Sequence, residues 1–194
     1  MTNPAVIILA CVLFFYSALE VSTSGFIRTF LEKDLAASSE SSKIIYTSFW
    51  IMMMLGRLIA SQVVKRVRGP QLLLGCSMGA ILGLLLMALA PNMLIATAGV
   101  ILCGLCYAPV FPTTAGTAST YFARIFGTVF GMLMTLALLS GAVIPPAIGY
   151  VAQHQSVRAG IWILAGIAVL LLMMQGIFTS YERRKLLPTT PGPA

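Results

Sequence analysis

Between Gly69 and Ala123 the chain has 55 consecutive residues without a charged side chain. A membrane-spanning helix needs about 20 predominantly apolar residues, so this stretch predicts two crossings, with Pro91-Asn92 as the turn between them. Over the whole chain 59% of the residues are hydrophobic and 9% are charged, whereas soluble domains carry about 25% charged residues. This composition excludes a soluble enzyme, a nucleic-acid-binding module and a disordered chain. The apolar runs are continuous, which also excludes the alternating pattern of an outer-membrane barrel.

The apolar runs together predict an all-α integral membrane protein with six transmembrane helices. The expected spans are residues 4–27, 44–64, 71–90, 93–114, 127–150 and 159–180, in a transmembrane domain of residues 1–181 that a tail, 182–194, follows. The charged stretch 32–43 is expected to be a loop, and Pro145-Pro146 is expected close to the end of the fifth span. No basic region or convincing cleavage site precedes the first span, so we interpret it as a retained span and not as a signal peptide.

The distribution of basic residues predicts the orientation in the membrane. Seven basic residues lie on the side of the tail, and four lie on the other side: the first group is Lys65, Arg66, Arg68, Arg124, Arg183, Arg184 and Lys185, the second Arg28, Lys33, Lys43 and Arg158. Cytoplasmic loops carry an excess of Lys and Arg. We therefore expect both termini in the cytoplasm, with the protein in the plasma or inner membrane. The net charge of +7 then needs no nucleic-acid partner.

Glu20 is a carboxylate inside the first predicted span. Tyr16 lies four residues before it and Ser24 four residues after it, with Ser17 and Thr23 three residues away on either side, so helical spacing predicts one polar stripe. Intramembrane carboxylates usually face a cavity or a partner, and burial favours the protonated form, which predicts proton binding. The alternative is a structural carboxylate that bonds a neighbouring helix or stays hydrated near the outer surface.

Arg57 is the second charged residue inside a predicted span. It lies two turns before Lys65, so its long side chain can extend toward the cytoplasm, and this structural interpretation is favoured. The alternative is that Arg57 pairs with a carboxylate or with helix-terminal carbonyls in an inner gate.

The fourth span contains Pro109 and Pro112. Proline removes a backbone donor and bends a helix, and freed carbonyls inside a membrane are tolerated where they line a cavity or meet side chains. We expect Tyr107, Thr113 and Thr114 to line a cavity for a polar solute. The alternative is a kink that only shapes the helix bundle.

Two further motifs are interpreted as structural. Cys103-x-x-Cys106 lies inside an apolar span with no second ligand pair, whereas a zinc site needs about four ligands. These cysteines are therefore expected to act as small apolar residues. The glycine ridges 75–83 and 127–131 are expected to pack helices together. Neither a nucleophile–base pair nor a cofactor motif appears, so no cofactor and no enzymatic activity are expected.

Several segments together resemble the major facilitator superfamily of transporters. Residues 56–66 are similar to the superfamily's segment between helices eight and nine. Residues 14–22, 111–113 and 127–150 are similar to helices seven, ten and eleven of its fucose/glucose-type sugar:proton symporter branch, and all the matches occur in the right order. The resemblance implies a C-terminal half of six helices, built as two inverted three-helix repeats, with a solute site at the interface to a second half. Lys65 departs from the family, which often has an acidic residue at that position. The N-terminal half, which supplies much of the proton-coupling chemistry in this branch, is absent from this chain.

The leading functional hypothesis is a half-transporter that moves a small, sugar-like solute by proton-coupled alternating access together with a second half. The residues expected to bind the solute or couple it to protons are Glu20, Tyr16, Ser24, Tyr107, Thr113 and Thr114. The residues expected to act in gating are Arg57, Lys65 and Arg66. The second half is another copy of this chain or a separately encoded N-terminal half, or else this chain is a truncated product of a longer gene. Met1 just before the first span fits all three. The alternative function is a non-transporting membrane subunit or regulator.

Overall fold

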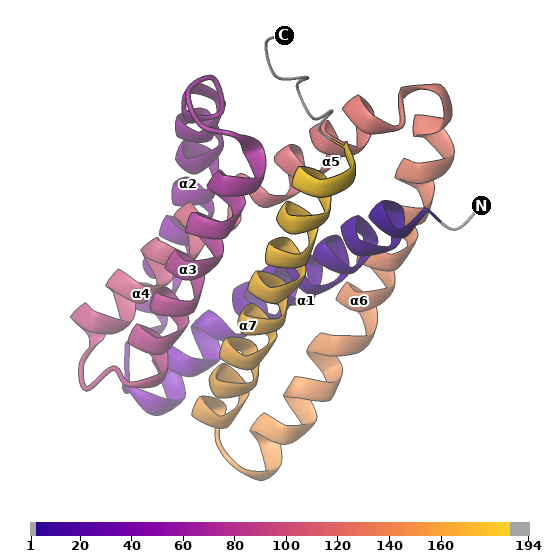
Figure 1. Ribbon diagram of the computed structural model, residues 1–194. Helices are drawn as coiled ribbons and strands as arrows, with labels where there is room; N and C mark the ends of the chain where they lie inside the picture. Colours follow the sequence, from indigo (N-terminus) through magenta and orange to yellow (C-terminus); the bar gives the residue numbers. More distant parts are fainter. Residues whose placement is uncertain (1–2, 187–194) are drawn as a thin grey trace, which may run out of the picture.

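The chain is helical in a computed structural model that describes residues 3–186, and no strand occurs in that range. The helices are α1 (Pro4–Asp34), α2 (Ser39–Val63), α3 (Gly69–Ala88), α4 (Met93–Tyr107), α5 (Val110–Tyr121), α6 (Phe126–His154) and α7 (Val157–Tyr181), with short helical segments at Ala123–Ile125 and Glu182–Leu186 (Figure 1). They form six membrane-length apolar segments, because α4 and α5 together make one crossing. The predicted all-α membrane fold is confirmed.

The charged stretch between the first two crossings is mostly helical, so the predicted loop is wrong. Only residues 35–38 separate α1 from α2. The Ser38 hydroxyl caps α2 by accepting a hydrogen bond from its first turn, as a good N-cap residue does. Glu32 accepts hydrogen bonds from Arg28 at 3.1 Å and from Ser42, which joins the two helix ends. Charged residues can therefore extend both helices beyond the apolar run.

The prolines act differently in the two helices that contain them. The expected kink is present in the fourth crossing, where α4 ends at Tyr107, Ala108 and Pro109 form the break, and α5 begins at Val110. By contrast, α6 continues through Pro145-Pro146 to His154, so the expectation that this pair lies near the helix end is wrong. Membrane helices tolerate interior prolines where neighbouring groups satisfy the freed carbonyls.

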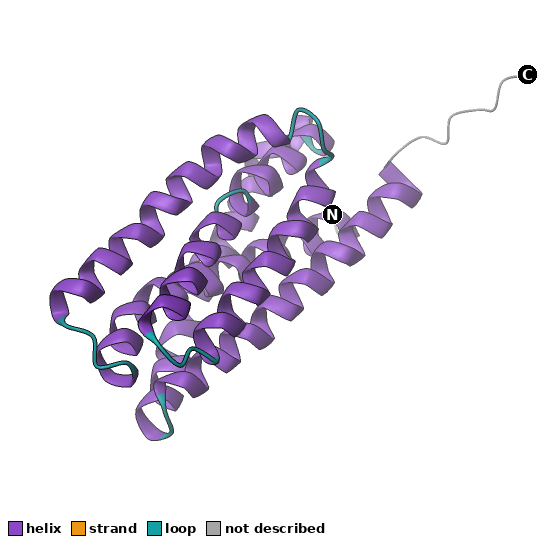
Figure 2. Cartoon of the chain, turned by 90° about the vertical axis from the view of Figure 1, so that its left-hand side faces the viewer, coloured by secondary structure: helices purple, strands orange, loops and turns teal. Residues whose placement is uncertain are grey.

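The packing of the helices follows the symmetry expected of two three-helix repeats. The first repeat consists of α1 to α3, and the second consists of α4 to α7, with α4 and α5 as one crossing. The first helix of each repeat packs against the other two crossings of the opposite repeat: α1 against α6 and α7, and α4 against α2 and α3. The third members, α3 and α7, pack against each other. In Figure 1, α2, α3 and α4 lie together on one side and α6 on the other. Figure 2 shows the long helices side by side along the bundle, with the connections at its two ends.

Close approach of α4 to α2 and α3 depends on glycine. An added Cβ at Gly56 would lie 2.6 Å from the Cβ of Ala108, and one at Gly83 would lie 2.7 Å from the Sγ of Cys103. Cys103 thus fills the space above a ridge glycine, which agrees with its expected role as a small apolar residue.

The ridge prediction holds for only part of the glycine pattern. In addition to Gly83, Gly79 is in close contact, because an added Cβ there would lie 2.5 Å from the Sγ of Cys106. Gly75, Gly127 and Gly131 have nothing within 4 Å of the position of an added Cβ, so they pack no helix within the described part of this chain.

Candidate functional site

Tyr16, Glu20 and Arg57 form a polar cluster between α1 and α2. The Tyr16 side chain is only 2% exposed, and its hydroxyl has no hydrogen-bond partner among residues 3–184. Glu20, one helical turn further along α1, and Arg57 from α2 both lie close enough to this hydroxyl to interact with it, although neither contact has the geometry of a hydrogen bond. The predicted i to i+4 relation of Tyr16 and Glu20 places them on one face of α1. A buried phenol thus lies next to an acid and a guanidinium.

Aromatic side chains from α2 and α4 hold this cluster in place. The rings of Tyr16 and Tyr107 meet edge to face with their centroids 6.5 Å apart, and Phe49 packs on Tyr107 at 6.3 Å. Tyr107 is fully buried, and its hydroxyl shares a hydrogen bond of 3.1 Å with Thr23. Tyr107 therefore adjoins the cluster, but Thr23 occupies its hydroxyl.

The Arg57 side chain is exposed and contacts the helix turn before it, on the side away from Lys65. Its Nη2 donates to the Sδ of Met53 at 3.6 Å, one turn in the opposite direction. Helical side chains lean toward the helix N-terminus, and here this brings the guanidinium beside Tyr16. Arg57 also forms no direct ion pair among the described residues.

The other expected residues lie apart from this cluster. Ser24 is half-buried and donates to the carbonyl of Val21 within α1. Thr114 is fully buried and donates to the carbonyl of Val110 within α5. Thr113 lines a separate groove that also reaches Arg57.

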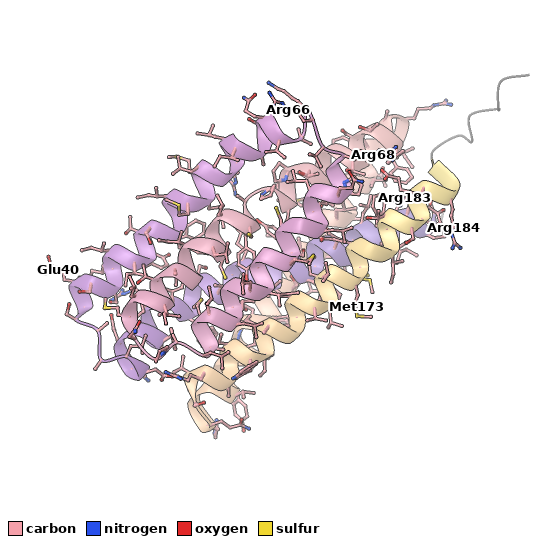
Figure 3. All side chains as sticks on the ribbon, turned by 60° about the vertical axis from the view of Figure 1, so that its left-hand side comes forward. Glu40, Arg66, Arg68, Met173, Arg183 and Arg184 are labelled. Atoms are coloured by element: carbon pink, nitrogen blue, oxygen red, sulfur yellow. The ribbon has the colours of Figure 1, made fainter. Side chains whose placement is uncertain are left out.

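The two remaining gating candidates, Lys65 and Arg66, are exposed in the turn between α2 and α3. The Nζ of Lys65 donates to Gln62 at 2.9 Å. Figure 3 shows Arg66 at the same end of the bundle as Arg68, Arg183 and Arg184, while Glu40 lies at the opposite end. The structure therefore separates these two residues from the Tyr16 cluster.

A groove of about 770 Å³ opens between α2 and α5. Its lining residues are Arg57, Ala60, Ser61, Val64, Arg68, Gly69, Pro70, Pro112, Thr113, Gly116, Thr117, Ser119, Thr120, Tyr121 and Glu182. It exists because α2 packs closely on α4 but hardly touches α5, since the break at Ala108 and Pro109 turns α5 away. The sequence predicted the break, but not the groove or the participation of Arg68.

A buried pair between α3 and α7 was missed by the sequence analysis. Ser77 donates to the side-chain oxygen of Gln175 at 2.7 Å, and the amide nitrogen of Gln175 has no partner in the described chain. Gln175 borders a cavity of about 10 Å³ together with Thr114 and Thr117, close to the space that one water needs. The available signal was that Gln175 is the one amide side chain in the predicted span 159–180.

These features define a helical membrane protein with six segments long and apolar enough to cross a membrane, two of which carry a charged residue inside the apolar run, Glu20 or Arg57. The model of the Major Facilitator Superfamily matches residues 9–193, and the chain belongs to this family. The glucose/mannose transporter GlcP of Bacillus subtilis (strain 168) is 25% identical over 174 residues, which cover 89% of this chain and 42% of that protein.

Among solved structures, the in meso crystal structure of the POT family transporter PepTSo matches the fold with a TM-score of 0.85. The sequence identity is 12%, and the match covers 100% of this chain and 40% of that chain, so it bears on the fold alone. The chain spans about two fifths of the length of both proteins.

Proposed function

We propose that this chain forms one half of a secondary transporter that moves a small, uncharged, sugar-like solute by proton-coupled alternating access. The observation that carries the proposal is the cluster of Tyr16, Glu20 and Arg57, which combines a buried hydroxyl that makes no hydrogen bond with one carboxyl group and one guanidinium group. Glu20 lies near the middle of the 31-residue α1, and intramembrane acids commonly belong to solute or proton pathways. The similarity to a protein named a glucose/mannose transporter supports a sugar-like solute.

Each expected residue receives a role in this proposal. Glu20 carries the proton, and Tyr16 binds the solute through its free hydroxyl. The further solute contacts during the transport cycle are Ser24, Tyr107, Thr113 and Thr114, and the gating residues are Arg57, Lys65 and Arg66. Proton arrival at Glu20 removes its charge and leaves Arg57 as the one charge beside Tyr16, which changes the preferred contact of the hydroxyl.

A second six-helix half completes the pathway in this proposal. It is supported by the relatives, which are more than twice as long, and by the open faces of α2 and α6. In each of these two crossings only 22% of the apolar 18-residue stretch is buried, which is the lowest share among the six crossings. The second half is another copy of this chain, a separate N-terminal half, or the remainder of a longer protein to which this chain belongs.

Uptake by proteoliposomes that contain this chain and its second half tests the role of Glu20. In Glu20→Gln, a proton gradient should no longer drive solute accumulation, whereas exchange of labelled for unlabelled solute should continue, because only the titrating group is lost. Glu40→Gln is the matched control, since Glu40 is exposed at the end of the bundle away from the tail. Unchanged pH-dependent accumulation in Glu20→Gln would contradict the proposal.

The alternative function is a non-transporting membrane subunit or regulator. A subunit that keeps only the fold should show neither flux nor a solute-dependent rise in thermal stability. A screen of sugars by thermal unfolding of the purified chain together with its second half separates the two functions, because a transporter gains stability from a bound solute.

A further inference from the structure

The groove between α2 and α5 has more positive than negative charge. Arg57 and Arg68 contribute two guanidinium groups, and neither takes part in an ion pair within the described chain. Glu182 contributes one carboxylate, but it is 7% exposed and accepts a hydrogen bond of 2.7 Å from the hydroxyl of Tyr121. Arg57 lies within the apolar crossing of α2, where charges are normally paired, and Arg68 is exposed at the end of the same groove. Two guanidinium groups beside one groove point to an anion from outside the chain.

Arg68 is the residue best placed to hold such an anion. It lies in the turn before α3, makes no side-chain cap bond to that helix, and is exposed toward the groove. The amino end of α3 at Gly69 opens onto the same groove, and its helix dipole adds to the positive potential. Arginine forms paired hydrogen bonds to phosphate oxygens, which fits this position.

Hydroxyl groups line the wall of the groove on the side of α5. Thr117 and Thr120 donate their protons to carbonyls of their own helix, and Ser61 on α2 does the same. Their oxygens therefore face the groove as acceptors. Acceptors do not bind phosphate oxygens, but they suit the hydroxyls of a polyol. A volume of about 770 Å³ is much larger than a single inorganic phosphate needs.

We propose that this groove binds a polyol phosphate, with the phosphate on Arg68 and the polyol hydroxyls against the α5 wall. The same chemistry occurs in the glycerol phosphate headgroup of a phospholipid and in a soluble sugar or glycerol phosphate. Both fit a basic groove at the end of the bundle that bears Arg66, Arg183 and Arg184. The proposal concerns binding alone and holds whether or not the chain transports a sugar.

Binding of short-chain phosphatidylglycerol to the purified chain in uncharged detergent tests this inference, with phosphatidylcholine as the neutral-headgroup comparison. Arg68→Gln should weaken phosphatidylglycerol binding by about tenfold, because it removes a charge-assisted contact to phosphate. Arg66→Gln is the matched control, since it removes the same charge from the same turn but lies outside the groove lining. Val64→Trp keeps every charge and should also abolish binding by filling the groove, which Val64 lines with 44% exposure.

Competition by glycerol phosphate identifies the source of the anion. Displacement of the lipid by glycerol phosphate supports a soluble ligand, and retention of the lipid supports a headgroup site. Equal loss of binding in Arg66→Gln and Arg68→Gln, or no preference of the wild type for phosphatidylglycerol, would overturn the proposal. Circular dichroism of each variant shows that the helices are intact, and Val64→Trp carries the test if Arg68→Gln does not fold.

Discussion

At the scale of single residues, Tyr16 and Tyr107 differ in whether the buried hydroxyl has a hydrogen-bond partner. A buried hydroxyl without a partner costs about 1–3 kcal/mol, and Tyr16 keeps such a group at 2% exposure. Tyr107, whose ring packs against Tyr16, has its hydroxyl bonded to Thr23. The two tyrosines are similarly buried, so they form a matched pair for mutation.

We expect Tyr16→Phe to leave the stability of the chain unchanged or slightly raised, because the substitution removes a hydroxyl that makes no hydrogen bond. Tyr107→Phe should lower the free energy of unfolding by about 1 kcal/mol, since it removes a buried hydrogen bond. Thermal unfolding of the purified variants measures both effects. Under the proposed function, Tyr16→Phe also weakens solute binding, and a clear loss of stability in Tyr16→Phe would show that the hydroxyl has a structural partner.

The sequence predicted part of the cluster at this scale and missed the rest. The pairing of Tyr16 with Glu20 follows from helical spacing alone. The direction of the Arg57 side chain does not follow from helical spacing. It depends on the neighbours that the side chain meets once α2 packs beside α1, and these neighbours are Met53 and Tyr16. Helical periodicity assigns a residue to a face, but it does not choose between rotamers.

At the scale of helices, the contact between α2 and α4 depends on the absence of a side chain at Gly56. The nearest atoms to an added Cβ there are the Cβ of Ala108 at 2.6 Å and the carbonyl oxygen of Leu105 at 2.8 Å. Neither belongs to a flexible side chain, so a methyl group must push the helices apart. This contact brings α2, and with it Arg57, to its place beside α1 and α4.

We expect Gly56→Ala to destabilise the protein by about 1–3 kcal/mol, the usual cost of overpacking a core contact. Gly166→Ala in α7 is the control, since nothing lies within 4 Å of its added Cβ and alanine favours a helix more than glycine does. Thermal unfolding in detergent compares the two variants. A similar effect of both substitutions would show that α2 and α4 are not in close contact.

The rules for proline predicted the break before α5 but not the continuity of α6. In both places a proline removes a backbone donor, so the local signal is the same. The difference arises from the neighbours of each helix, because a freed carbonyl is tolerated wherever packing or another polar group satisfies it. Residues 145–146 therefore lie inside a helix that ends at His154.

At the scale of the whole molecule, the charges at the two ends of the bundle predict its orientation. Figure 3 shows Arg66, Arg68, Arg183 and Arg184 at one end and Glu40 at the other. In membranes of intact cells, a membrane-impermeant maleimide should label Gln155→Cys, which lies in the turn between α6 and α7, and should spare Arg184→Cys. The reason is the excess of Lys and Arg on cytoplasmic loops.

The unmodified chain measures the background from its four free cysteines, two of which are buried. Labelling of Arg184→Cys without labelling of Gln155→Cys would show that the orientation is opposite to the predicted one.

The second half should contact α6, because this crossing is among the least buried of the six. Leu138 on α6 is 72% exposed, and we expect Leu138→Cys to form a crosslink to another protein chain with a bifunctional maleimide in native membranes. Met173→Cys is the control, since Met173 on α7 is 54% exposed and points away from the bundle in Figure 3. A crosslinked product of twice the chain mass identifies a homodimer. Equal crosslinking of both variants would contradict a specific interface at α6.

Length and hydropathy alone establish that this chain is a membrane protein with six crossings, because each crossing must satisfy its backbone internally over a fixed thickness. The family resemblance is also visible in the order of its motifs, and the family match confirms it. The sites are different in kind, because they depend on contacts between residues far apart in the chain. The meeting of Tyr16 with Arg57, the groove between α2 and α5, and the pairing of Ser77 with Gln175 arise only when packed helices fix the direction of each side chain.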